Sequence, residues 1–227
     1  MASILDITLL SLQASLVAVA GMLVPALLVA SYLVRNQGRL AFAIDLIVSM
    51  PLALPPVAVG FVLLWFFGAT GPLGSITDGL AFSWVAMSIA SAVVAFPLVV
   101  RAFIAGLAEV DPRLVFAARN LGASRLRAAW DVTLPLARRG IAAGLLLGFV
   151  RSFAEFGATI VFAGNIPGDT QGLPSAIFSR IAAGDFSGAW VLAAVSITIG
   201  GIALAIHNRL VSNYRDRSKI GSRSNGS

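Results

Sequence analysis

Arg151 and Glu155 lie four positions apart in an otherwise apolar stretch of the chain, LLLGFVRSFAEFGATIVFAG. A charged group near the centre of a bilayer costs at least a few kcal/mol, and by some measures ~10 kcal/mol or more. Charges kept there more often face the protein interior or a watery cavity than lipid, and they mark ion pathways. We therefore expect a pathway or gate for an ion. For an anion, Arg151 would supply the attraction, the hydroxyl groups of Ser152 and Thr159 would assist, and Glu155 would keep the ion from being held too tightly.

The same pair also has a purely structural interpretation. Residues four apart lie on one face of a helix, so the two charges can neutralise each other against a neighbouring helix and only fix its packing. If the span begins near Gly140, Arg151 lies ~16 Å along it, close to the middle of the bilayer.

A second candidate site is the segment SMPLALPPVAVG, which contains Pro51, Pro55 and Pro56. Each proline lacks a backbone donor and disturbs the helical hydrogen bonds. Carbonyl groups freed in this way are costly in lipid, so the segment is expected to be buried or to line a cavity. A simple kink is the alternative.

Residue types for covalent or metal chemistry are scarce. The chain has no cysteine and one histidine, His207, so a thiol nucleophile and a histidine metal cluster are excluded. An intramembrane protease is disfavoured, because Asp45 is the only aspartate well placed within an apolar segment. The chain also lacks a Gly-x-x-x-x-Gly-Lys phosphate loop, and its one lysine is Lys219. We expect a non-catalytic protein without a metal or cofactor.

The composition places these residues in a membrane. Of 227 residues, 58% are hydrophobic and 11% are charged, whereas a soluble domain carries about 25% charged residues. Five apolar segments are long enough to cross a bilayer, which takes about 20 residues. They are Ile7–Val34, Leu40–Phe67, Leu80–Leu107, Gly140–Ala163 and Gly188–Leu210.

The basic residues indicate the orientation of these spans. They cluster between the first and second spans, between the third and fourth, and after the fifth, whereas Arg180 stands alone on the opposite side. Basic residues mark the cytoplasmic side. The N-terminus is therefore expected outside and the C-terminus in the cytoplasm, and the net charge of +6 needs no nucleic acid to explain it.

The longest loop on the cytoplasmic side runs from about residue 109 to residue 136. Asp111 before Pro112 is a helix-start signal, and Leu114–Asn120 reads as a short amphipathic helix. Gly122 can end that helix with a positive φ. Ser124 can cap a second helix that runs through Trp130 and stops before Pro135. The loop is either a docking element for a cytoplasmic protein or a connection that lies on the membrane surface.

The sequence of this loop resembles a known family. FAARNLGASRLRAAWDVTLP is similar to the EAA loop of ABC-importer permeases, whose pattern is Glu-Ala-Ala, three residues, Gly, nine residues, an Ile-like residue, any residue and Leu-Pro. The positions that match in register are Ala117, Ala118, Gly122, Val132, Leu134 and Pro135. Phe116 replaces the leading Glu, which removes any charge-mediated contact from that position.

The next stretch, FAEFGATIVFAGNIPGDTQGLPSAI, resembles the permease of molybdate importers, to which sulfate and tungstate permeases are related. The resemblance implies an all-α integral membrane protein with about five transmembrane helices and the type I ABC-importer permease fold. It also implies a homodimeric pore in the cell membrane, two cytoplasmic ATPase subunits that dock on the loops, and an outer binding protein that delivers the oxyanion. Residues 1–210 would form the transmembrane domain and 211–227 a disordered basic tail.

Two alternatives remain open. The transported anion could be sulfate or tungstate, since both share the shape and double charge of molybdate. A secondary carrier or channel without an ATPase partner is a different class of protein. Such proteins often contain internal repeats, and none is evident here. Gly140, Gly144 and Gly148 recur at every fourth position and predict a close contact with a neighbouring helix or with a second copy.

Overall fold

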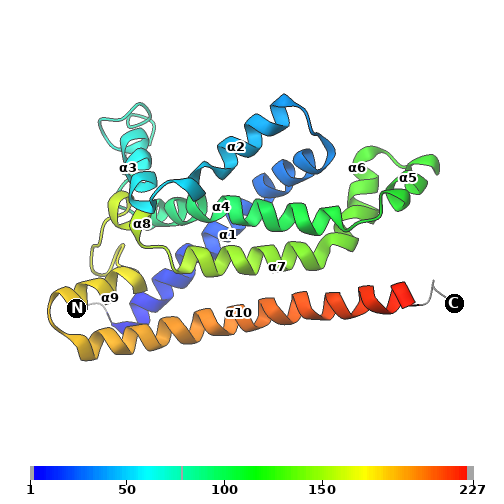
Figure 1. Ribbon diagram of the computed structural model, residues 1–227. Helices are drawn as coiled ribbons and strands as arrows, with labels where there is room; N and C mark the ends of the chain where they lie inside the picture. The colour runs from blue at the N-terminus through cyan, green and yellow to red at the C-terminus, as the bar shows by residue number, and fades with distance from the viewer. Residues whose placement is uncertain (1–2, 78, 224–227) are drawn as a thin grey trace.

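The computed structural model describes residues 3–77 and 79–223, and in this part of the chain the regular secondary structure is all helix, joined by turns and loops (Figure 1). The elements are α1 (Ile4–Arg35), α2 (Arg39–Ala53), α3 (Pro56–Phe67), α4 (Trp84–Ala108), α5 (Pro112–Asn120), α6 (Arg125–Ala128), the π-helix η1 (Ala129–Thr133), α7 (Leu134–Phe153), α8 (Gly157–Phe162), α9 (Leu173–Ala182) and α10 (Phe186–Arg223). The predicted all-α fold is confirmed.

Four helical stretches of the described chain are long and apolar enough to cross a membrane: α1, α4, the run α6–η1–α7 and α10 as far as Val211. The pair α2 and α3 makes a fifth candidate if the two are counted as one bent span. About five spans were predicted, and this count agrees. The predicted tail 211–227 lies only partly within the described residues: the backbone of α10 is helical as far as Arg223. The predicted disorder of this tail stays a prediction.

Helix α4 lies at the centre of the bundle and packs against α1 and α7, while α10 packs against α7 and α9. Half of the apolar window of α4 is buried, which is more than in any other candidate span of the described chain. One buried cluster joins α1, α4 and α7 through Met22, Val99, Phe103 and Ala137. His207 of α10 adds a polar contact, with its Nδ1 2.9 Å from the carbonyl oxygen of Ala143 in α7.

The second predicted span, Leu40–Phe67, is not one helix. Helices α2 and α3 meet at an angle of 113°. Leu54 is extended, with φ −92° and ψ 143°, because a residue before proline avoids the helical region. Pro56 then begins α3 in the first turn, where a missing N–H costs nothing. Two consecutive prolines therefore produce a full break instead of a kink.

The fourth predicted span, Gly140–Ala163, is also interrupted. Helix α7 ends at Phe153, and α8 begins only at Gly157. The prediction that Pro135 ends a helix is wrong, because the chain stays helical from Arg125 through η1 into α7. Pro135 cannot donate to the carbonyl of residue 131, and the wider π-helical turn directly before α7 accommodates that missing bond.

The predicted glycine face contacts α4 of the same chain. A Cβ atom on Gly140 would lie 2.6 Å from the Cα of Gly106, and one on Gly148 would lie 2.5 Å from a methyl group of Val99. Gly144 faces the ring of Phe103, and a Cβ atom there would lie 2.9 Å from that ring. The three glycines thus allow the backbones of α4 and α7 to approach closely.

We expect Gly140→Ala to lower the thermal midpoint of the purified protein, because the backbone of α4 cannot yield to the added methyl group; overpacking costs ~1–3 kcal/mol. Gly200→Ala in α10 is the matched control, since nothing lies within 4 Å of its Cβ position. That change should be neutral or stabilising, because alanine favours a helix by roughly 1 kcal/mol over glycine. Equal midpoints for the two variants in micelles would refute the close contact.

Candidate functional site

The loop from Glu109 to Leu136, called the coupling loop below, has the predicted helix–turn–helix form. The Oδ1 atom of Asp111 accepts a hydrogen bond from the backbone N–H of Arg113 at 2.9 Å and so caps α5. Gly122 has φ +91° directly after α5. The hydroxyl of Ser124 accepts from the N–H of Arg127 at 3.2 Å and caps α6. The local signals in the sequence therefore place the start of both short helices and the end of the first one correctly, whereas the second helix continues through η1 into α7.

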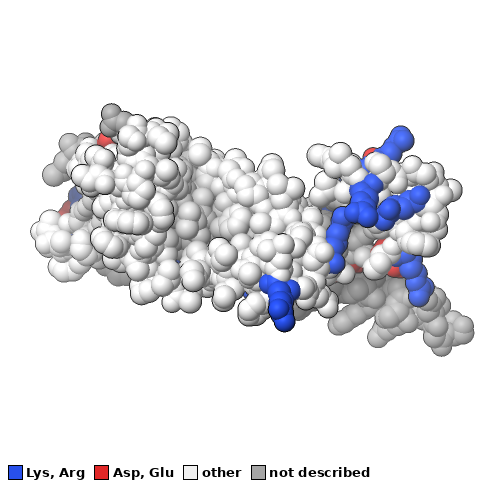
Figure 2. Space-filling view, turned by 90° about the horizontal axis from the view of Figure 1, so that it is seen from above, with Lys and Arg blue, Asp and Glu red and all other residues white. Residues whose placement is uncertain are grey.

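Large apolar side chains project from the coupling loop into solvent. The exposed fractions are 67% for Phe116, 89% for Leu121, 70% for Leu126 and 64% for Trp130. Figure 2 shows arginine side chains gathered at the same end of the molecule, while the visible middle carries little charge. An exposed apolar patch rimmed by polar residues is typical of a protein interface.

The remaining predicted loop residues lie along the same connection. Ala117 is exposed and Ala118 half-buried on α5. Val132 is half-buried in η1, and α7 begins with Leu134, half-buried, and Pro135, exposed. The loop thus joins rigidly to α7 through one uninterrupted helical run, so a displacement of the loop would be transmitted to that span.

Arg151 and Glu155 form an ion pair, but not within one helix. The Nη1 atom of Arg151 lies 2.7 Å from Oε2 of Glu155, and the two side chains are 33% and 1% exposed. Arg151 belongs to the last turn of α7, whereas Glu155 lies in the break before α8. The Oε1 atom of Glu155 accepts a hydrogen bond from the N–H of Ala158 at 2.9 Å. The carboxylate therefore neutralises Arg151 and holds the start of α8 at the same time.

The two predicted hydroxyl groups are engaged with main-chain carbonyls. Ser152 donates to the carbonyl of Ser91 in α4 at 3.4 Å, and Thr159 donates to that of Phe156 at 2.9 Å. Both side chains are buried. Of the four predicted pathway residues on this segment, only Arg151 has a side chain with substantial exposure.

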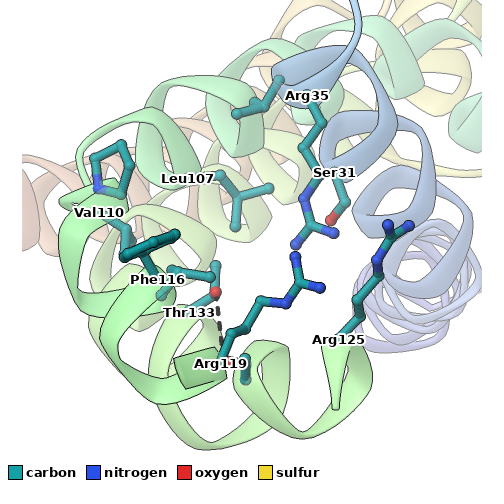
Figure 3. Close-up of a pocket in the computed structure, with 12 residues that line it drawn as sticks. Ser31, Arg35, Leu107, Val110, Phe116, Arg119, Arg125 and Thr133 are labelled. Carbon is teal, nitrogen blue, oxygen red and sulfur yellow. Dashed lines mark hydrogen bonds between the residues drawn. The ribbon is translucent and has the colours of Figure 1, made fainter. Parts of the chain in front are cut away.

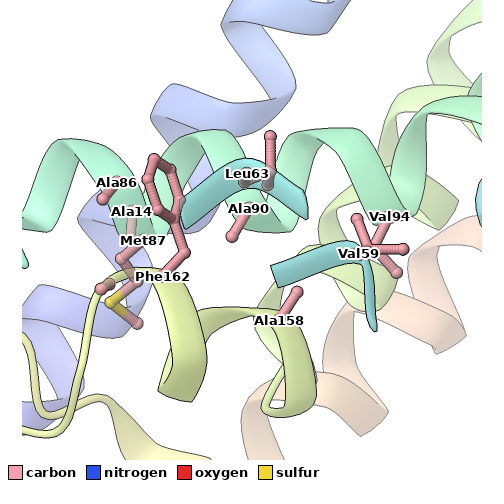
Figure 4. Close-up of a cluster of buried hydrophobic side chains, with 10 residues drawn as sticks. Ala14, Val59, Leu63, Ala86, Met87, Ala90, Val94, Ala158 and Phe162 are labelled. Atoms are coloured by element: carbon pink, nitrogen blue, oxygen red, sulfur yellow. The ribbon is translucent and has the colours of Figure 1, made fainter. Parts of the chain in front are cut away.

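The breaks at 54–56 and 154–156, together called the double break below, meet in space. A Cβ atom on Gly157 would lie 2.9 Å from Cβ of Pro56, and one on Gly60 would lie 2.5 Å from the carbonyl oxygen of Ala158. Figure 4 shows the apolar contact beyond them, where Val59 and Leu63 of α3 face Ala158 and Phe162 of α8. The structure thus joins the predicted candidates Pro55, Pro56 and the charged pair into one unit.

Sequence reasoning missed a second charged pair. Arg101 of α4 donates through Nη2 to Oδ2 of Asp45 at 3.0 Å and to the hydroxyl of Ser49 at 2.9 Å, both in α2. The side chains of Arg101 and Asp45 are 50% and 34% exposed. Half-exposed charges within candidate spans are costly in lipid, so this face of α2 and α4 is suited to water or to another protein chain. The signal was present, because Asp45 is an isolated acidic residue in an apolar segment.

Residues 21–216 match the family of binding-protein-dependent transport system inner membrane components. Over 216 residues the chain is 43% identical to the molybdenum transport system permease protein ModB of Escherichia coli, covering 92% of this chain and 94% of that protein. The corresponding protein of Haemophilus influenzae is 45% identical over 185 residues, covering 78% of this chain and 80% of that one. A crystal structure of a bacterial ABC transporter involved in alginate import shares the fold, with a TM-score of 0.69 at 16% identity over 90% of this chain and 79% of that one.

Proposed function

Since the chain belongs to the family of binding-protein-dependent transport system inner membrane components, we propose that it is the membrane-spanning subunit of an ATP-driven importer of oxyanions, molybdate above all. The observation that carries the proposal is the coupling loop, whose two capped helices expose an apolar patch and continue into a membrane span. The permease relatives over most of the chain favour molybdate over sulfate or tungstate.

The proposed assembly has two copies of this chain around one pore, two cytoplasmic ATPase subunits on the coupling loops, and a binding protein outside. ATP chemistry belongs to the separate subunits, because the chain has no phosphate loop and a single lysine. In this proposal the coupling loop and the C-terminus face the cytoplasm and the N-terminus faces outside, which is supported by the clustering of basic residues on one side of the spans. The docking surface would be formed or oriented by the predicted loop residues, which are Asp111, Phe116, Ala117, Ala118, Gly122, Val132, Leu134 and Pro135.

In the proposed pathway, Arg151 is the residue that contacts the anion, and Glu155 positions the side chain of Arg151. Because the Glu155 side chain is almost fully buried and bonded to both Arg151 and the start of α8, it moderates the charge of Arg151 without touching the anion. The double break lies directly after the turn of α7 that contains Arg151. Pro55 and Pro56 belong to one half of it, and Ser152 and Thr159 flank the other half. A break buried against protein keeps the freed backbone groups away from lipid.

Co-purification tests this proposal against a secondary carrier or channel. The tagged chain, expressed together with the ATPase subunit of its transporter, should retain the ATPase through size exclusion in micelles. Leu121→Asp and Leu126→Asp, which place charges in the exposed apolar patch, should release the ATPase while the chain itself stays folded, since both side chains are mostly exposed. Ile76→Asp, at a side chain that is 80% exposed on the opposite outer loop, is the matched control. A chain that transports molybdate without any ATPase would contradict the proposal.

A further inference from the structure

An open cavity of about 450 Å³ lies between the cytoplasmic ends of α1 and α4 and the coupling loop (Figure 3). It is separate from the double break. Of the exposed apolar patch, Phe116 lines the cavity, whereas Leu121, Leu126 and Trp130 do not. Three arginines from three different elements line it: Arg35 ends α1, Arg119 lies in the last turn of α5, and Arg125 begins α6.

Figure 3 shows the guanidinium groups of Arg35 and Arg119 facing each other, with the guanidinium group of Arg125 to one side of them, and all three side chains line the cavity. Among the described side chains, no carboxylate forms an ion pair with Arg35, Arg119 or Arg125, whereas Arg101, Arg127, Arg151 and Arg180 each have such a partner. Positive charges that converge without a counter-charge repel one another. An anion bound between the three guanidinium groups would be attracted to each of them and would offset their mutual repulsion.

The residues that line the cavity indicate which class of anion it could bind. Arginine presents a planar set of donors that matches phosphate-type oxygens in pairs. The hydroxyl of Ser31 also lines the cavity, while Leu107 and Val110 supply an apolar side. Arg35 and Leu107 lie at the ends of candidate spans, which is the level of lipid headgroups, where basic pockets between spans bind anionic headgroups.

We propose that this cavity is a binding site for a phosphate group or a similar tetrahedral oxyanion, held by Arg35, Arg119 and Arg125. The group comes from one of two sources with the same chemistry: the headgroup of an anionic phospholipid, or a free oxyanion in the cytoplasm. Because the site joins α1 to both coupling-loop helices, its occupancy fixes the loop relative to the first span. The proposal goes beyond the transport function and does not depend on which anion is transported.

The test uses the full chain in nanodiscs of phosphatidylcholine, with two titrations. One arm raises the fraction of phosphatidylglycerol, and the other adds inorganic phosphate to discs without anionic lipid; the thermal midpoint and native mass spectrometry report binding. In the variant Arg35→Gln/Arg119→Gln/Arg125→Gln, binding should weaken about a hundredfold, since each basic residue near an anionic group contributes roughly a fivefold gain.

The matched control is Arg113→Gln/Arg138→Gln/Arg139→Gln, which removes the same charge from the same end of the molecule without touching the cavity lining. Ser31→Phe is a further variant that fills the cavity and keeps all three charges, and it should weaken binding as well. Binding in the lipid arm assigns the headgroup as the source, and binding in the phosphate arm assigns the free oxyanion. The proposal is overturned if neither arm shows binding, or if the control loses as much as the cavity variant. It is also overturned if the cavity variant releases the ATPase subunit in micelles, which would make the arginines docking contacts.

Discussion

Glu155→Gln is expected to destabilise the protein by up to ~3 kcal/mol, the lower end of the cost of breaking a buried ion pair, because the Arg151 side chain left behind is 33% exposed. The glutamine oxygen can still accept the hydrogen bond from the N–H of Ala158, so the variant removes the charge and keeps the cap of α8. Arg151 is left without its counter-charge at the double break. The thermal midpoint of the assembled complex should fall markedly, and uptake of molybdate should fall with it because an unbalanced cation holds the anion.

The double variant Arg151→Gln/Glu155→Gln separates packing from transport. Replacing a buried pair as a whole is often close to neutral for stability, so the double variant should recover most of the lost midpoint. Under the pathway proposal it should assemble and still transport poorly, because the cation that meets the anion is gone. Full uptake by the double variant would show that the pair only fixes packing.

Gly122→Val is expected to reduce the stimulation of ATP hydrolysis by the transported oxyanion. Gly122 has φ +91° between α5 and α6, a conformation that a β-branched residue adopts only with a strain of ~1–3 kcal/mol. Nothing lies within 4 Å of its Cβ position, so the effect arises from the backbone and not from a clash. We expect a roughly tenfold loss of oxyanion-stimulated ATP hydrolysis in membranes, because ~1.4 kcal/mol of strain shifts an equilibrium about tenfold.

Gly184→Val provides the matched control for this experiment. Gly184 has φ +77° and also has nothing within 4 Å of its Cβ position, but it lies between α9 and α10, far along the chain from the coupling loop. It should show a similar loss of stability with normal stimulation of the ATPase. If the two variants lose stimulation equally, or if Gly122→Val keeps it, the coupling loop does not have the proposed role.

The features that the sequence predicted well are those encoded within a few neighbouring residues. Asp111 before Pro112, Ser124 before Arg125 and the glycine at 122 define caps and a turn locally, and the structure has each of them. The long apolar segments likewise give the three spans that are continuous helices, α1, α4 and α10, because their length alone matches the bilayer, whereas the other two segments are interrupted. The Arg151–Glu155 pair was predicted from spacing, and the ion pair exists, although a break separates the two residues along the helix.

The features that the sequence did not predict depend on contacts between distant segments. The helical break at 154–156 contains no proline; it is compensated by Glu155, which caps α8, and by Gly157, which lets Pro56 approach. The cap from Glu155 is local, but nothing within residues 140–163 alone reveals that Pro56 packs against Gly157. The Arg101–Asp45 pair and the convergence of Arg35 with Arg119 and Arg125 are also set by the packing of α1, α2 and α4. Pro135 was misread because a π-helical turn can accommodate a proline that would otherwise end a helix.

The most direct test of the central claim is uptake by the purified complex in proteoliposomes. The chain is reconstituted with its ATPase, and the binding protein, molybdate and ATP are supplied on their respective sides. Molybdate should accumulate only when ATP and the binding protein are both present, and an excess of sulfate should compete weakly. Accumulation that proceeds without ATP, or an absence of any oxyanion uptake by a complex that still hydrolyses ATP, would contradict the account.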